Sequence, residues 1–98
     1  MLMKLTLTDP VNIALRTLGE DDRLEVLTWI DHLKNWESDK FVRDHSPQLP
    51  SDPNVRVLQT DSDFRIFFKR HKGGFVILDI ARKETIMAFK RAAEQAQQ

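Results

Sequence analysis

The stretch from Asn54 to Glu84, NVRVLQTDSDFRIFFKRHKGGFVILDIARKE, most constrains the fold of this 98-residue chain. It contains three short apolar runs separated by turn residues, and basic residues alternate with apolar ones along two of these runs. Alternation with a period of two is typical of a β-sheet that buries one face and exposes the other. The stretch therefore predicts three antiparallel strands with one apolar face and one positively charged, partly aromatic face.

The first half of the chain predicts a strand followed by two helices. Leu5 and Leu7 alternate with polar residues, as in a half-buried strand. A helix is expected from Pro10, where a missing N–H costs nothing, to Gly19, a residue that commonly ends helices. The apolar stripe of a second helix consists of Val26, Trp29, Ile30, Leu33 and Trp36. Residues 38–53 are expected to form one helical turn and then a proline-rich loop.

Turn residues set the expected register of the three later strands. A turn at residues 61–62 would pair Val57 with Ile66, and a three-residue loop at 71–73 with a bulge would pair Ile66 with Leu78. The predicted core face carries Val55, Val57, Phe64, Ile66, Phe68, Val76, Leu78 and Ile80. The predicted opposite face carries Arg56, Leu58, Arg65, Phe67, Lys69, Phe75, Ile77 and Asp79, with Arg65 opposite Asp79.

The whole pattern predicts an α+β fold in the order β-α-α-β-β-β-α. It is a small antiparallel sheet with two helices packed on one face and a short C-terminal helix carrying Phe89. The length fits a single domain over residues 1–98, with the polar tail from about residue 94 expected to fray.

Composition excludes several kinds of chemistry. Cysteine is absent, so disulfides, thiolate metal sites and cysteine nucleophiles are excluded, and neither a metal nor a cofactor is expected. No apolar run is long enough to span a membrane, and no signal peptide is recognisable, so a cytoplasmic location is expected. Residues 1–53 carry six Lys and Arg against ten Asp and Glu, whereas residues 54–98 carry nine against five. This segregation of charge favours an oriented interaction surface on the second half.

The strand Phe64-Arg65-Ile66-Phe67-Phe68, followed by a strand that ends in basic residues, resembles the RelE/ParE superfamily of bacterial toxins. The resemblance extends over nearly the whole chain in the order and length of its elements. It implies the RelE-like fold and the toxin component of a type II toxin–antitoxin system, held in a hetero-oligomer by a cognate antitoxin. The RelE branch cleaves mRNA in the ribosomal A site without a metal, and the ParE branch inhibits DNA gyrase.

The resemblance also implies roles for individual residues. Arg65 matches the arginine that contacts the scissile phosphate, and Lys83 with Arg82 matches the basic position after the last strand, so these three are the candidate catalytic residues. Four further residues are expected to bind the RNA backbone or bases: Arg56, Lys69, Phe67 and Phe89. Arg56 and Lys69 alternate with apolar residues on strands beside Arg65, so their cationic groups are expected to converge with it.

Proton transfer is the least determined part of this hypothesis. His71 is the candidate general acid or base, because histidine titrates near neutral pH, although it lies at the expected hairpin tip. The chain also departs from RelE at two positions: Leu58 replaces a lysine, and Phe89 replaces a tyrosine. Three functions therefore remain open: a ribosome-dependent endoribonuclease, a non-catalytic gyrase inhibitor of the ParE kind, and an inactive binding module with the same fold.

Overall fold

The computed structural model describes residues 4–59 and 63–86. Its elements are β1 (Lys4–Leu7), α1 (Asp9–Thr17), α2 (Glu20–His32), the 3₁₀ helix η1 (Leu33–Asn35), α3 (Lys40–Asp44), β2 (Gln48–Leu49), β3 (Asp52–Gln59), β4 (Phe64–His71) and β5 (Gly74–Arg82). Residues 83–86, directly after β5, are helical. Phe89 and the polar tail from residue 94 lie outside the described residues.

The five strands form one mixed sheet in the order β1-β5-β4-β3-β2. The predicted α+β fold is confirmed, including the antiparallel meander of β3, β4 and β5. The prediction of a purely antiparallel sheet is wrong, because β1 pairs in parallel with β5 at one edge. Parallel neighbours need a long crossover connection, and the helices that follow β1 are part of it.

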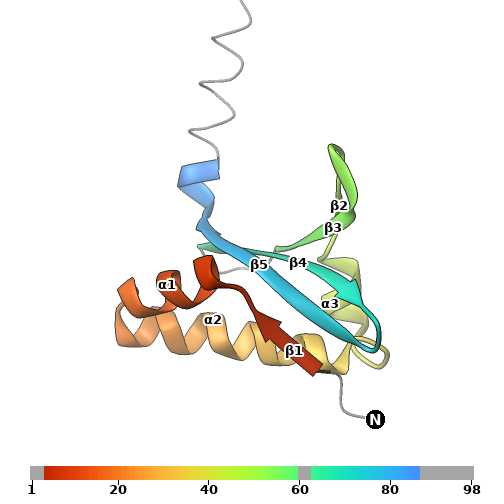
Figure 1. The fold of residues 1–98 in the computed structure, drawn as a ribbon, viewed down its shortest axis with the longest axis horizontal. Coiled ribbons are helices and arrows are strands. Elements are labelled where there is room, and N and C mark those ends of the chain that lie inside the picture. The colour runs from red at the N-terminus through yellow and green to blue at the C-terminus, as the bar shows by residue number, and fades with distance from the viewer. Residues whose placement is uncertain (1–3, 60–62, 87–98) are drawn as a thin grey trace, which may run out of the picture.

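Both long helices lie against the same face of the sheet (Figure 1). Pro10 lies in the first turn of α1, where no intrahelical N–H is needed. The acidic residues 20–22 form the first turn of α2, where their charge is favourable against the helix dipole. The buried side chains between helices and sheet form one cluster: Val11, Leu15, Val26, Ile30, Leu33, Trp36, Val42, Leu58, Phe64, Ile66, Phe68, Phe75, Ile77 and Ile80.

β3 and β4 pair one residue away from the predicted register. Leu58 lies opposite Ile66, where the sequence analysis placed Val57, and Arg56 lies opposite Phe68. Directly opposite residues share a face, so Arg56 and Leu58 belong to the helix-covered face and Val57 to the other. Both registers place an aliphatic residue of β3 against Ile66, so the apolar pattern alone cannot choose between them.

A β-bulge interrupts β5. Asp79 lies opposite Phe67, but Ile77 lies opposite Phe68, so Leu78 has no counterpart on β4. A bulge of one residue exchanges the two faces of a strand between its ends. The bulge lies within β5, away from the turn where the sequence analysis expected one.

The bulge changes which residues of β5 enter the core. Phe75 and Ile77 are buried before it and Ile80 is buried after it. Ile80 is therefore a correct core prediction. Val76 and Leu78 are wrong core predictions, because strict alternation cannot continue through an extra residue.

The β4–β5 turn is shorter than predicted. His71 pairs with Gly74, which leaves only Lys72 and Gly73 between the strands. Both have positive φ angles, 31° for Lys72 and 76° for Gly73, as a two-residue type I′ turn requires. The predicted three-residue loop is therefore wrong.

No helix in the described part of the chain is long and apolar enough to cross a membrane.

Candidate anion-binding site on the open face

The sheet face that α1 and α2 leave uncovered carries a mixture of polar and aromatic side chains. Gln59 lies opposite Arg65, and Val57 lies opposite Phe67, on the adjacent strands β3 and β4. Lys69 follows two residues after Phe67 and therefore shares its face. We call the face defined by these five residues the open face.

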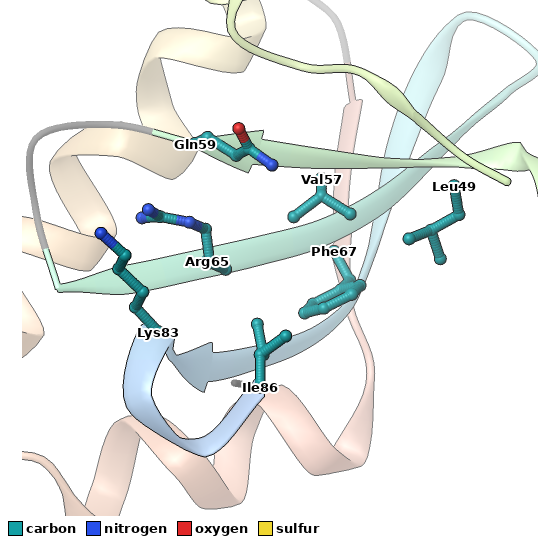
Figure 2. Close-up of a pocket in the computed structure, with 7 residues that line it drawn as sticks. All are labelled: Leu49, Val57, Gln59, Arg65, Phe67, Lys83 and Ile86. Atoms are coloured by element: carbon teal, nitrogen blue, oxygen red, sulfur yellow. The ribbon is translucent and has the colours of Figure 1, made fainter. Parts of the chain in front are cut away.

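A hollow of about 260 Å³ lies on the open face (Figure 2). It is lined by Leu49, Val57, Gln59, Arg65, Phe67, Lys83 and Ile86. These residues come from β2, β3, β4 and the helical segment after β5. The hollow therefore depends on the tertiary fold and not on one local motif.

The polar groups of the hollow gather at one end. In Figure 2, Arg65 and Lys83 reach toward the same end, with Gln59 on the neighbouring strand. The Lys83 backbone N–H donates to the Asp63 carbonyl oxygen at 2.8 Å, which holds the residue after β5 beside the start of β4. The Arg65 Nη1 donates to the Phe64 carbonyl oxygen at 3.0 Å. These contacts position the Arg65 guanidinium group and the backbone of Lys83.

This end of the hollow is suited to an anionic oxygen. A guanidinium group donates parallel hydrogen bonds in a fixed plane, and an ammonium group adds a second positive charge. The Gln59 amide can donate as well as accept. Since phosphate presents several acceptor oxygens, these three side chains together match a phosphodiester.

The other end of the hollow is apolar. Leu49, Val57, Phe67 and Ile86 line it, and Phe67 is only partly buried. An aromatic ring at such a position can stack on a nucleobase, and apolar neighbours exclude water from the adjacent charges. The hollow therefore combines an anion-binding end with a surface for a flat apolar group.

Arg56 does not belong to this site, so its predicted convergence with Arg65 is wrong. It lies on the helix-covered face, where its Nη1 donates to the Ser46 carbonyl oxygen at 2.9 Å. Its guanidinium carbon lies 5.5 Å from the centre of a Trp36 ring. The reason is the one-residue difference in the β3–β4 register, because a shift of one residue places a side chain on the opposite face of the sheet.

Arg56→Met is expected to lower the free energy of unfolding by about 1–2 kcal/mol, from the lost hydrogen bond and cation–π contact. Urea denaturation measures this effect. Met retains most of the side-chain volume, and the open-face hollow is unchanged. Unchanged stability together with weakened anion binding would place Arg56 in the site and contradict this assignment.

Arg82 also lies on the helix-covered face, although it precedes Lys83 directly. It is opposite Phe64 on β4, and its guanidinium carbon lies 4.7 Å from the centre of that ring. It forms ion pairs with Asp22 at 3.3 Å and Asp63 at 3.5 Å. Its predicted place in the same site as Arg65 is therefore wrong, because consecutive strand residues point to opposite faces.

The two other predicted residues of β4 lie along the open face but outside the hollow. Lys69 is four residues from Arg65, about 13 Å along an extended strand, and His71 is about 20 Å away. A side chain at that distance cannot transfer a proton at the Arg65 end. The structure therefore does not bring His71 together with Arg65 and Lys83, and its acid–base role stays a prediction.

The predicted partner of Arg65 across β4 and β5 is also wrong. Ala81 lies opposite Arg65, and Asp79 lies opposite Phe67. The Asp79 carboxylate accepts a hydrogen bond from the Ile80 N–H at 2.8 Å. The bulge at Leu78 produces this shift.

Gln59, Leu49 and Ile86 also line the site, although the sequence did not predict them there. Gln59 would have followed from the correct β3–β4 register, because that register places it beside Arg65. Leu49 belongs to a two-residue strand inside a proline-rich segment, and no periodicity can be read from two residues. Within residues 4–59 and 63–86, no cluster of three or more His, Asp and Glu side chains could hold a metal ion.

The arrangement of strands and helices is that of the RelE toxins. The chain aligns with a free Escherichia coli RelE carrying two arginine-to-alanine substitutions, with a TM-score of 0.66, 13% identity, and coverage of 97% of this chain and 98% of that one. It aligns with a crystal structure of isolated E. coli RelE at a TM-score of 0.59 and 15% identity, covering 94% and 99% of the two chains.

A third similar structure is a conserved hypothetical protein from Helicobacter pylori, solved in solution. Its TM-score is 0.57 at 15% identity, with 86% of this chain and 97% of that one covered. No protein-family model matches the sequence, and a search of curated proteins found no significant match. The protein therefore has a RelE-like fold over nearly its whole length, which confirms the resemblance read from the sequence at the level of the fold.

Proposed function

We propose that this protein is the toxin component of a type II toxin–antitoxin system and cleaves ribosome-bound mRNA without a metal. The observation that carries the proposal is the open-face hollow, where Arg65 and Lys83 from separate elements reach toward one end. The RelE-like fold supports it. The proposal includes a cytoplasmic location and a cognate antitoxin in a hetero-oligomer.

The proposed reaction is a transesterification within the mRNA. The 2′-oxygen of one nucleotide attacks the adjacent phosphorus, and the bond from phosphorus to the 5′-oxygen of the next nucleotide breaks. Arg65 holds the phosphate and stabilises the charge that develops on its oxygens. Lys83 lies beside it and donates a proton to the departing 5′-oxygen.

The remaining proton leaves the attacking 2′-hydroxyl. The described residues that line the hollow include no carboxylate or imidazole to accept it. The proposal therefore assigns the base to a group outside this set, in the ribosome-bound complex. Phe67 and the apolar end of the hollow contact the neighbouring base.

Purified protein added to ribosomes that carry a defined mRNA tests this function. Cleavage within the A-site codon, leaving a 2′,3′-cyclic phosphate on the upstream fragment, is expected. Intact mRNA in the presence of folded protein would contradict the proposal.

The lack of a carboxylate or imidazole among the described lining residues favours a second candidate function, binding without chemistry. In that case the protein would inhibit DNA gyrase in the manner of ParE, or act as an inactive binding module. A supercoiling assay separates these functions. Inhibition of gyrase while the mRNA stays intact would support the ParE-like gyrase inhibitor. If neither assay responds and induced expression leaves growth unaffected, the binding module remains.

A further inference from the structure

A second group of basic residues lies at the β4–β5 hairpin, at the opposite end of β4 from Arg65. Lys69, Arg70, His71 and Lys72 are consecutive in the sequence and all are exposed. Like charges in sequence repel one another, so a run of this kind favours a surface that meets an anion.

Two hollows adjoin these residues. One, of about 390 Å³, is lined by Pro53, Asn54, Arg56, Lys69, Arg70 and His71. The other, of about 290 Å³, is lined by Arg70, His71, Lys72, Gly73 and Gly74. Neither shares a residue with the hollow that contains Arg65.

Lys72 occupies a backbone conformation that lysine adopts at a cost. Its φ angle is 31°, and it is the one residue other than glycine with a positive φ in the described part of the chain. Asparagine, aspartate or glycine is usual at the first position of a type I′ turn. The lysine at this position places a positive charge at the tip of the hairpin.

The hairpin is held firmly against the neighbouring strand. A Cβ atom on Gly74 would lie 2.3 Å from the Lys4 carbonyl oxygen, so the backbones of β5 and β1 are in close contact. The Lys4 N–H also donates to the Gly73 carbonyl oxygen at 3.4 Å. The basic residues are thus carried by a hairpin whose backbone packs closely against β1, which favours a defined binding geometry.

The basic residues of the hairpin divide between the two faces of the sheet. Arg70 forms an ion pair with Glu37 at 3.3 Å and lies 5.7 Å from the centre of a Trp36 ring. Its charge is therefore engaged on the helix-covered side. Lys69 and His71 lie on the open side of β4, and Lys72 extends from the turn.

One face of β4 therefore alternates cations with rings. Arg65, Phe67, Lys69 and His71 follow one another at spacings of about 7 Å, two residues of a strand. Cations that track a backbone, interleaved with rings that stack on bases, are the usual means of binding single-stranded nucleic acid. An acidic polypeptide would use the cations but has no need for the rings.

We propose that the β4–β5 hairpin is a second phosphate-contacting site, through Lys69 and Lys72, for a single RNA strand that runs along β4 from the Arg65 hollow. The inference rests on the proposed function in naming RNA as the occupant. It goes further in assigning contacts about 13–23 Å along the strand from Arg65. These contacts hold the strand and take no part in the chemistry.

The test compares RNA binding by the wild type and by Lys69→Gln/Lys72→Asn. Asparagine tolerates a positive φ better than lysine, so the variant should melt at the same temperature as the wild type or higher. Binding of a fluorescein-labelled oligouridylate is followed by anisotropy over a range of salt concentrations. Each lost phosphate contact reduces the slope of log K against log salt by about 0.7 for single strands, so a reduction of about 1.4 is expected.

The matched control is Lys34→Gln/Lys40→Gln, which removes the same charge from η1 and α3. Its slope should equal that of the wild type. An unchanged slope in the hairpin variant, or an equal reduction in the control, would overturn the inference. The inference would also be overturned if the hairpin variant lost affinity for poly-glutamate while its slope of log K against log salt for RNA stayed unchanged. That result would indicate an acidic protein partner.

Cleavage on ribosomes is measured separately with the same proteins. If the proteins bind RNA with the expected salt dependence but the mRNA on ribosomes stays intact, the proposed function is contradicted and this inference is still supported. If the wild type cleaves mRNA but the hairpin variant shows the same salt dependence of RNA binding as the wild type, this inference is overturned and the proposed function is supported.

Discussion

Arg65→Ala is expected to lower the rate of mRNA cleavage on ribosomes by about 100-fold, a typical loss when one preorganised donor to a developing oxyanion is removed. The guanidinium group lies at the polar end of the open-face hollow, beside Lys83. It is the group that can bind two phosphate oxygens at once. Single-turnover cleavage of a defined mRNA on saturating ribosomes measures the effect.

Arg82→Ala is the matched control for this prediction. Arg82 has the same side chain and directly precedes Lys83, but it lies on the helix-covered face. Its ion pairs with Asp22 and Asp63 join side chains that are about half exposed, so they contribute little stability. The control should cleave at close to the wild-type rate. Equal losses in the two variants would show that general positive charge, and not the hollow, supports cleavage.

Phe68→Ala is expected to lower the free energy of unfolding by about 3–5 kcal/mol, the usual cost of truncating a buried phenylalanine. Phe68 is fully buried in the middle of β4. Its ring centre lies 5.9 Å from that of Trp36 and 5.6 Å from that of Phe75, with edge-to-face geometry at both contacts. A domain of this size has a total stability of about 5–15 kcal/mol, so the variant should be close to unfolding. Urea denaturation measures the loss.

Phe41→Ala provides the comparison. Phe41 is 42% exposed and packs on the surface against His45 and Trp29. Its truncation should cost about 1 kcal/mol or less. Similar losses at positions 41 and 68 would contradict the assignment of the core to the sheet face under α1 and α2.

The fold was predictable from the sequence wherever local periodicity determines structure. The proline at the start of α1 and the alternation along β4 each depend on neighbouring residues, and each was interpreted correctly. The stripe of the second helix was correct only as far as His32, because Leu33 begins a 3₁₀ helix that Trp36 caps. The parallel pairing of β1 with β5 was not predictable in this way. It depends on the pairing of two strands that are far apart in the sequence, and the local residue pattern does not specify that pairing.

The register of the strands was the main error. Val57 and Leu58 are adjacent apolar residues, so β3 can bury either one against Ile66. In β5, the continuous apolar run Phe75–Leu78 shows no alternation before the bulge at Leu78, so the face of each residue cannot be read from the sequence. Sequence alternation specifies register only when one register alone would bury a polar residue. In β3 it does not, because the predicted register turns Gln59 toward the helices and the observed register turns Arg56 there.

The errors at the candidate site follow from those register errors. Arg65, Phe67 and Lys69 were assigned to the correct face, because the alternation within β4 is unambiguous. Arg56 was assigned to the wrong face by the β3–β4 register. Gln59 was overlooked for the same reason, although it lies directly opposite Arg65.

The most direct test of the proposed site is a nuclear magnetic resonance titration of the labelled protein with a short RNA that carries a 2′-deoxy substitution at the cleavage position. Without its 2′-hydroxyl the RNA binds but cannot react. Chemical-shift changes are expected to centre on Gln59, Arg65, Phe67 and Lys83. Changes centred instead on Arg56 and Arg82, on the helix-covered face, would contradict the assignment of the site.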